Sequence, residues 1–230
     1  MKKIIHQIYG LFDDGKDISE VPSPENPIFL INTQFTEIIC KDQKIEYKLW
    51  NKEDCDNLIK SDFYIYSQLW DDFFEPIQKA DFIRYCILYK YGGIYLDCDI
   101  KPYQPFSELF EKEFFFCHLH DDKKKLPYNA VMGSKPKNEL FKVIMCECEK
   151  SFYEKRNIEI YGEWRGRFVF QTTGHFMLDR VMKNNRINKY KYFHDDLYIF
   201  NPDKKGDAIG DMNKALFYDS NASVWYDNLI

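Results

Sequence analysis

The chain has 230 residues, a length that suits one folded domain with a sizeable hydrophobic core. Its formal net charge is -5 and its lysines are scattered along the sequence, which argues against a nucleic-acid groove. Seven cysteines without framework spacing argue against a secreted disulfide scaffold and favour reduced thiols in the cytoplasm. No stretch approaches the roughly 20 apolar residues of a membrane helix, so we expect at most peripheral contact at the inner face of the cell membrane.

The first part of the chain predicts alternating strands and helices. The expected elements are a strand at 2–9, a helix at 26–40, a strand at 45–50, a helix whose cap is formed by Asn51 and Asp54, and a helical stretch at 61–75. Such alternation predicts an α/β domain with a largely parallel sheet. Ligands of these sheets gather beyond the carboxyl ends of the strands, where Tyr9 and Asp99 would both lie.

The central stretch predicts a helix from Pro76 to Gly92, followed by a strand. Proline lacks the N–H that a helix start leaves unsatisfied, and glycine adopts the left-handed cap at little cost. Apolar residues between these ends recur at helical spacing and predict one buried stripe, while Asp81 and Arg84, three residues apart, share a face. After the glycines the pattern has period two, with Ile94, Leu96, Cys98 and Ile100 on one side and Tyr95, Asp97 and Asp99 on the other.

The second half of the chain has fewer signals. We expect a short strand at 114–118, a surface helix at 136–155 and a late edge strand at 192–200. The sequence Thr172-Thr173-Gly174-His175 precedes an apolar run, which predicts a loop that leads into a helix N-terminus. Asn129 is expected in a loop, where asparagine often serves only to form a turn.

Two acids on one face of the predicted strand suggest a cation site. Asp97 and Asp99 would repel each other, and aspartate is depleted in strands, so the pair is unfavourable unless a cation lies between the two side chains. An all-oxygen site suits Mg²⁺ or Mn²⁺ better than Zn²⁺, and such ions are usually completed by substrate phosphates. The alternative is an exposed strand end with both carboxylates solvated, because so short a pattern occurs by chance in many proteins.

The residues around this pair resemble a known signature. Asp81-x-x-Arg84-Tyr85 followed by Tyr91-Gly92-Gly93-Ile94-Tyr95-Leu96-Asp97-x-Asp99 resembles the DXD-motif sugar transferases of glycosyltransferase family 32, the capsular-polysaccharide and Och1-like group. It is more distantly similar to the catalytic domains of the large clostridial glucosylating toxins. The resemblance implies a GT-A-like nucleotide-binding fold with a mostly parallel central sheet flanked by helices. It also implies one domain over 1–230, with a nucleotide-sugar-binding half at 1–110 and an acceptor-side half at 111–230.

The resemblance implies roles for several residues near the motif. Asp99 would hold Mn²⁺ or Mg²⁺ with Asp97 alongside, and Tyr95 would lie against the donor. Asp81 and Arg84 would reach the sugar hydroxyls, although a salt bridge between them is the simpler reading.

Further donor contacts are implied outside the motif. Tyr9 occupies a position where the toxins stack a tryptophan on uracil, but it could also be an ordinary aromatic at a strand end. Asn129 matches an asparagine that touches the donor sugar. His175 replaces a proline that the family often has, which favours a structural role for this histidine.

The end of the chain carries the last part of the resemblance. Ser223-Val224-Trp225 has the spacing of the toxin Ser-x-Trp that closes over the donor phosphates, although a terminal tryptophan can be a packing anchor. Asp219 stands where the polysaccharide branch usually has a histidine, so the third protein ligand of the metal lies between Asp219 and Asn221.

The implied reaction moves a sugar from a nucleotide sugar to a saccharide or lipid-linked oligosaccharide acceptor, with retention of configuration, in bacterial surface or capsular polysaccharide synthesis. UDP-Gal, UDP-GlcNAc or UDP-Glc is favoured by the toxin-like residues Tyr9, Ser223 and Trp225, with GDP-Man as the other donor. One alternative is a non-catalytic nucleotide-sugar-binding subunit. A DxD phosphatase is a weaker one, because Lys101 occupies the place where those enzymes carry Thr or Val.

Overall fold

The structure is a computed structural model that describes residues 1–12, 26–119, 126–156, 165–185 and 216–219. Its helices are α1 (Asn26–Asp42), α2 (Lys52–Asp62), α3 (Ser67–Asp72), α4 (Pro76–Tyr91), α5 (Glu139–Lys155), α6 (Arg165–Thr172) and α7 (His175–Asn184), with short 3-10 turns at Tyr64–Tyr66 and Ser107–Glu111. Its strands are β1 (Ile4–Ile8), β2 (Glu46–Trp50), β3 (Gly93–Leu96), β4 (Ile100–Pro102), β5 (Phe114–Leu119), β6 (Leu126–Ser134) and β7 (Phe217–Asp219). In this part of the chain, no helix is long and apolar enough to span a bilayer.

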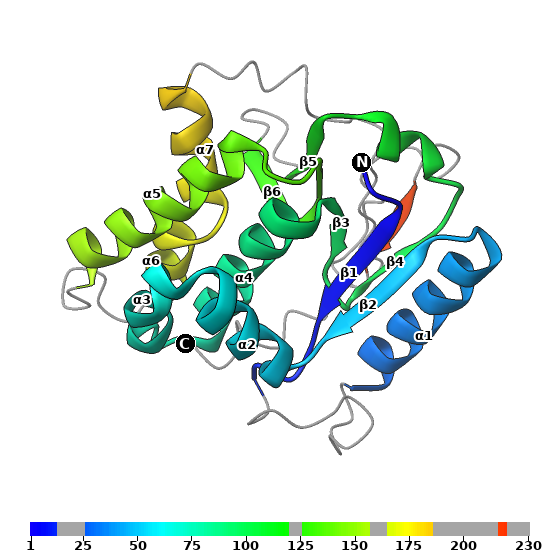
Figure 1. The fold of residues 1–230 in the computed structure, drawn as a ribbon, viewed down its shortest axis with the longest axis horizontal. Coiled ribbons are helices and arrows are strands. Elements are labelled where there is room, and N and C mark those ends of the chain that lie inside the picture. The colour runs from blue at the N-terminus through cyan, green and yellow to red at the C-terminus, as the bar shows by residue number, and fades with distance from the viewer. Residues whose placement is uncertain (13–25, 120–125, 157–164, 186–215, 220–230) are drawn as a thin grey trace, which may run out of the picture.

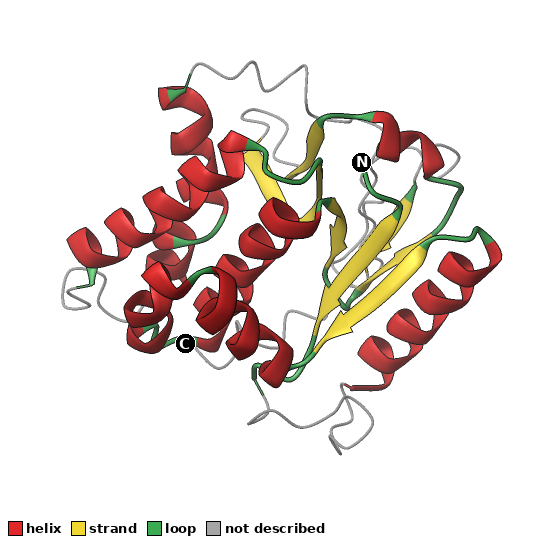
Figure 2. Ribbon diagram, viewed as in Figure 1, coloured by secondary structure: helices red, strands yellow, loops and turns green. Residues whose placement is uncertain are grey.

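A five-stranded sheet in the order β2-β1-β3-β6-β5 forms the centre of the molecule (Figures 1 and 2). β1 pairs in parallel with β2 and β3, whereas β6 runs antiparallel to both β3 and β5. Four of the five strands therefore run in one direction, and the predicted mostly parallel sheet flanked by helices is confirmed. A second sheet consists of β4 and β7, which pair antiparallel.

Helices cover both faces of the sheet, and each face has its own hydrophobic cluster. The side chain of Tyr95 packs in a cluster with the helices α2 to α7. Its neighbours Ile94 and Leu96 point to the other face and pack with residues of α1, β4 and β7. This alternation is the period-two pattern of a strand that is buried on both faces.

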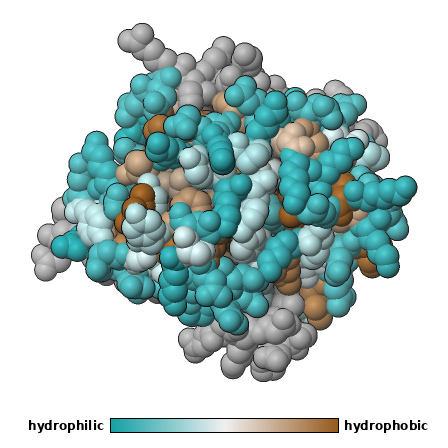
Figure 3. Space-filling model, viewed as in Figure 1, coloured by the Kyte–Doolittle hydropathy of each residue, from teal (hydrophilic) through white to brown (hydrophobic). Residues whose placement is uncertain are grey.

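Most of the apolar side chains lie inside these clusters. Figure 3 shows that the face toward the viewer is mostly hydrophilic, with small and separate apolar patches. Exposed apolar residues do occur, for example Ile31 and Ile38 of α1, which are 59% and 57% exposed.

Helix α4 has the predicted ends but not the predicted single buried stripe. It begins at Pro76 and is capped by Gly92 in the left-handed region, with φ 66°. All residues from Ala80 to Leu88 are buried, because the sheet lies on one side of the helix and α5 and α6 lie on the other. The expectation of one buried stripe was wrong, and the polar side chains of α4 are therefore inside the protein.

Most of the other predicted elements are observed. Asn51 and Asp54 form a reciprocal capping box at the start of α2, and the strand at 114–118 is present as β5. The helix expected at 136–155 begins at Glu139, where the side chain of Asn138 accepts a hydrogen bond from the backbone N–H of Leu140. The edge strand expected at 192–200 lies outside the described residues.

Two predictions about the site were wrong. The strand pattern expected to run to Ile100 stops at Leu96, and Asp97 to Asp99 lie in a turn that leads into β4. Asn129 lies inside β6 rather than in a loop. The loop expected at Thr172–His175 is present, with only Thr173 and Gly174 between α6 and α7.

Candidate functional site

Two glycines form the corner between α4 and β3. Gly92 and Gly93 have φ values of 66° and 93°, in the left-handed region that only glycine adopts readily. A Cβ atom on Gly93 would lie 2.5 Å from the Cγ2 atom of Ile4, so β1 could not approach this closely if residue 93 had a side chain. The corner thus lets β3 enter the sheet directly beside β1.

A buried histidine fixes the same corner. The His6 Nε2 atom lies 3.0 Å from the carbonyl oxygen of Gly92, and the Trp50 indole N–H donates to His6 Nδ1 at 3.2 Å. This arrangement requires the tautomer with its proton on Nε2, which donates to Gly92. Burial lowers the pKa of His6 to about 4, so the ring is neutral and serves as a structural link.

The turn after β3 carries the two acids to the carboxyl edge of the sheet. The N–H of Ile100 donates to the carbonyl of Asp97 at 3.0 Å and closes the turn. The N–H of Asp97 donates to the carbonyl of Ala130 in β6 at 2.9 Å. On the other side, the Cys98 thiol donates to the carbonyl of Ile8 at 3.1 Å, so both neighbouring strands hold the turn.

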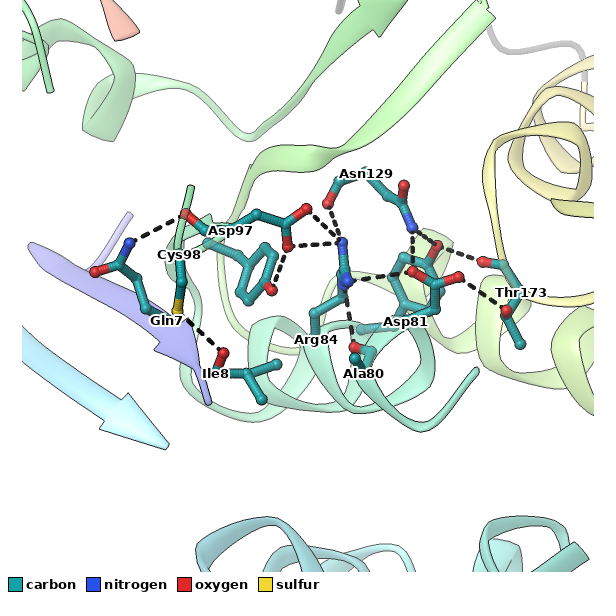
Figure 4. A network of polar contacts seen from close by, with 11 residues as sticks. Gln7, Ile8, Ala80, Asp81, Arg84, Asp97, Cys98, Asn129 and Thr173 are labelled. Atoms are coloured by element: carbon teal, nitrogen blue, oxygen red, sulfur yellow. Dashed lines mark hydrogen bonds and ion pairs between the residues drawn. The ribbon is translucent and has the colours of Figure 1, made fainter. Parts of the chain in front are cut away.

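Arg84 is the buried cation at the centre of the site (Figure 4). Its Nη2 lies 3.2 Å from Asp81 Oδ1, and its Nη1 lies 3.1 Å from Asp97 Oδ1. Nη1 also donates to the carbonyl of Asn129 at 2.9 Å, and the guanidinium lies 4.8 Å from the centre of the Tyr95 ring. Arg84 therefore joins the helix that carries Asp81 to the turn that carries Asp97.

Asp81 is 4% exposed, and both of its carboxylate oxygens accept hydrogen bonds inside the protein. Its Oδ1 accepts from the amide of Asn129 at 2.8 Å, and its Oδ2 accepts from the hydroxyl of Thr173 at 2.9 Å. Tyr85 completes this group, because its hydroxyl donates to the Thr173 carbonyl at 2.7 Å and accepts from the Asn129 amide at 3.2 Å. Burial raises the pKa of Asp81 to about 6, an effect that the charge of Arg84 and the hydrogen bond from Thr173 partly offset.

Asp97 is held in a different way from Asp81. Its Oδ1 accepts from the hydroxyl of Tyr95 at 2.6 Å in addition to its ion pair with Arg84, and its side chain is 29% exposed. Burial raises the pKa of Asp97, and the charge of Arg84 and the hydrogen bond from Tyr95 oppose that rise. Asp97 thus reaches the surface while both of these partners orient it from inside.

A third acid joins the turn from the far end of the described chain. Asp219 is buried at the end of β7 and pairs with Ile100 of β4, the residue after Asp99. Burial raises the pKa of the Tyr128 hydroxyl, and the charges of Asp219, Asp99 and Asp97 raise it further. The charges of all three acids therefore act on the same tyrosine, and Arg84 opposes them.

This donor set fits a hard divalent cation but is incomplete in the described residues. Carboxylate oxygens are the ligands that Mn²⁺ and Mg²⁺ prefer, and Asp99 and Asp219 come from neighbouring strand ends. Across the described ranges, no group of three or more His, Cys, Asp or Glu side chains is arranged to hold a metal ion. Asn221, the other predicted third ligand, lies outside the described residues.

Comparison with known proteins identifies the region that holds most of this site. Residues 22–116 match the family described as "Glycosyltransferase sugar-binding region containing DXD motif". This DXD region includes Asp81, Arg84, Asp97 and Asp99, but not Asn129, Thr173 or Asp219.

Curated relatives match part of the chain. The chain is 35% identical over 107 residues to an uncharacterized glycosyltransferase of Acanthamoeba polyphaga mimivirus, covering 44% of this chain and 43% of the relative. It is 46% identical over 55 residues to inositol phosphoceramide mannosyltransferase 3 of Schizosaccharomyces pombe, covering 24% of this chain and 15% of the relative. A second such enzyme of that yeast, inositol phosphoceramide mannosyltransferase 2, is 32% identical over 106 residues, covering 46% of this chain and 30% of the relative. The match spans less than half the length of these relatives.

A solved structure shares the fold. The PaToxG glycosyltransferase superposes with a TM-score of 0.51 over 80% of this chain and 70% of that chain, at 14% sequence identity. The predicted GT-A-like fold is confirmed by this likeness together with the sheet and its flanking helices.

Of the remaining predicted residues, the structure describes Tyr9 and His175. Tyr9 follows β1, and its ring lies 6.0 Å from that of Phe29 in α1. Ser223 and Trp225 lie outside the described residues. His175 begins α7 with its ring 4.4 Å from that of Phe170, which is a structural contact.

Sequence reasoning missed two residues of the network, Thr173 and Tyr85. Thr173 lies 92 positions from Asp81 in the sequence, and only the threonine pair before Gly174 hinted at a special loop. Tyr85 is part of the Asp81-x-x-Arg84-Tyr85 motif, whose two charged residues alone were given roles.

Proposed function

We propose that the chain is a glycosyltransferase that moves a sugar from a nucleotide sugar to an acceptor hydroxyl. One observation carries the proposal: the acidic turn of the DXD region lies at the carboxyl edge of a GT-A-like sheet, tied through Arg84 to the buried Asp81. Ligands of open α/β sheets bind at this edge.

The chemistry of the acids suits a departing diphosphate. Asp99, with Asp219 or Asn221 as the further ligand, would hold Mn²⁺ or Mg²⁺, which when bound neutralises the negative charge that grows on the leaving phosphate. Asp97 would lie alongside, held in place by Arg84 and Tyr95.

The chain's own residues orient the donor sugar. Asp97 is the partly exposed end of a network whose other end is buried, so the network presents fixed polar groups to a ligand at the sheet edge. Asp81, Arg84 and Asn129 would bind the sugar hydroxyls and set the face from which the acceptor attacks. Such positioning needs rigid groups, and each of these three side chains has at least two partners inside the protein.

The donor class is proposed from two kinds of likeness. The Schizosaccharomyces pombe relatives are named mannosyltransferases of inositol phosphoceramide, which supports GDP-Man as donor and a lipid-linked acceptor. The toxin-like residues Tyr9, Ser223 and Trp225 support UDP-Gal, UDP-GlcNAc or UDP-Glc. Because those yeast names state that mannose is the transferred sugar, we favour GDP-Man over the UDP-sugars.

A thermal-shift screen tests this proposal. The protein is heated with each of the four nucleotide sugars, with and without Mn²⁺, because a ligand that binds only the native state raises the melting temperature by mass action. We expect a shift that requires both Mn²⁺ and a nucleotide sugar, followed by slow hydrolysis of the same donor. The proposal is refuted if no donor shifts the melting temperature and none is hydrolysed, and binding without any turnover would instead indicate a nucleotide-sugar-binding subunit.

A further inference from the structure

Gln7 of β1 lies behind the acidic turn and has no assigned role. Its side chain is 0% exposed, and its Nε2 donates to the carbonyl of Asp97 at 3.1 Å (Figure 4) and to the carbonyl of Ile100 at 3.4 Å. These carbonyls belong to the first and last residues of the turn, which the N–H of Ile100 closes by donating to Asp97. One glutamine amide therefore bridges both ends of the turn that carries Asp97 and Asp99.

The amide of Gln7 is itself held by the next strand. The hydroxyl of Tyr47 in β2 donates to Gln7 Oε1 at 2.9 Å. A glutamine side chain offers two N–H donors and one carbonyl acceptor, and this arrangement uses the acceptor and directs the donors at two backbone carbonyls. The opposite amide orientation would place three oxygens against one another, so the contacts define which way the amide points.

The contact also reaches the third acid. Ile100, whose carbonyl Gln7 binds, pairs with Asp219 across the small sheet of β4 and β7. If the amide were lost, two carbonyls that now accept from it would each lose a donor, and the turn would be free to shift relative to β1. Asp97, Asp99 and Asp219 would then change their spacing together.

We propose that Gln7, supported by Tyr47, is a positioning residue that sets the spacing of the acids for the cation and diphosphate. The role of Gln7 in catalysis rests on the proposed glycosyltransferase function. The clamp, by which we mean the two hydrogen bonds from Gln7 to the carbonyls of Asp97 and Ile100, does not. Hydrogen-bonding partners behind metal ligands commonly change metal affinity by about 10- to 100-fold when removed.

Hydrogen exchange tests the clamp without any ligand. Gln7→Met keeps the length of the side chain but removes the amide. Gln78→Met is the matched control, because Gln78 is also 0% exposed and its Nε2 donates to Thr172 Oγ1 at 2.9 Å, away from the turn. We expect the amides of Asp97 and Ile100 to exchange roughly tenfold faster in Gln7→Met, relative to α5 in the same protein, and at the parent rate in the control. Unchanged exchange in Gln7→Met refutes the clamp.

Binding of Mn²⁺ then tests the positioning role. Loss of the free Mn²⁺ signal in electron paramagnetic resonance is measured with GDP and with UDP, for the parent, Gln7→Met, Tyr47→Phe and Gln78→Met. We expect an affinity about 10- to 100-fold weaker in Gln7→Met, a smaller loss in Tyr47→Phe and parent affinity in Gln78→Met. If the parent binds and Gln7→Met binds equally well while its turn exchanges faster, the positioning role is wrong. If the parent protein binds neither Mn²⁺ nor nucleotide, the proposed function is refuted and the positioning role with it. The hydrogen-exchange measurement still shows in that case whether Gln7 holds the turn.

Discussion

The Arg84 side chain balances two acids inside the protein, so its removal should be costly. Asp81 depends on the charge of Arg84 more than Asp97 does. The side chain of Asp81 is 6% exposed, whereas that of Asp97 is 29% exposed and partly screened by water. Removing one partner of a buried ion pair typically costs about 3–5 kcal/mol, since it leaves the other charge buried and unpaired. Arg84 also donates to the carbonyls of Ala80 and Asn129. We therefore expect Arg84→Met to lower the free energy of unfolding by about 3–5 kcal/mol, mainly through Asp81.

A double-mutant cycle with Asp81→Asn isolates this coupling. Asparagine carries no charge, so Arg84→Met/Asp81→Asn should be more stable than Arg84→Met alone, with a coupling energy of about 1–3 kcal/mol. Unfolding in urea at pH 7, followed by circular dichroism, measures all four proteins. Lys52→Met is the control, because the Lys52–Asp56 pair is exposed and should contribute no more than about 0.5 kcal/mol. Additive effects of the two site substitutions would show that Arg84 does not compensate the charge of Asp81.

Three further predictions follow from the same site. The pKa of Asp81 is raised from 3.8 to about 6, so the folded protein holds this proton more tightly than the unfolded chain does. The stability that Asp81 contributes is therefore complete below about pH 4 and is lost as the pH rises to about 6. Asp81→Asn should remove this loss, as measured by urea unfolding between pH 4 and 7. Gly93→Ala places a side chain at positive φ and against Ile4, and should lower stability by roughly 1–3 kcal/mol in thermal unfolding, whereas a smaller loss would mean that β1 can move aside. Asp97→Asn/Asp99→Asn should abolish the Mn²⁺-dependent thermal shift with nucleotide sugars, and a double variant that responds like the parent, with chelator present or absent, would contradict the cation site.

The elements with local signals could be predicted from the sequence. Pro76 and Gly92 mark the ends of α4, and the Asn51–Asp54 cap marks the start of α2, because these residue types act on their own neighbouring backbone groups. The direction of β6 could not be predicted in this way. It is set by its pairing with β3, from Gly93 with Ser134 to Leu96 with Val131, which joins residues far apart in the sequence.

The hydrophobic periodicity of the sequence failed mainly to predict which polar residues are buried. Asp81 and Arg84 looked like one polar face of an amphipathic helix, since a pattern of residue types does not report which neighbours pack on that face. They are buried because Asn129 and Thr173, from distant elements, supply the hydrogen bonds that their charges need. The same holds for Gln7, which meets Asp97 across 90 positions of sequence.

The structure also changes the argument about the acid pair. The sequence suggested that Asp97 and Asp99 together require an external cation, yet Asp97 is paired with Arg84 and accepts from Tyr95. The protein therefore supplies the counter-charge for one acid of the motif from inside. Asp99 precedes β4, whose Ile100 pairs with Asp219, so under the proposed function these two acids would be the ones that hold the divalent ion. The two positions of the motif are thus not equivalent: the first acid connects the turn to the buried network, and the second, under the proposed function, would bind the cation together with Asp219.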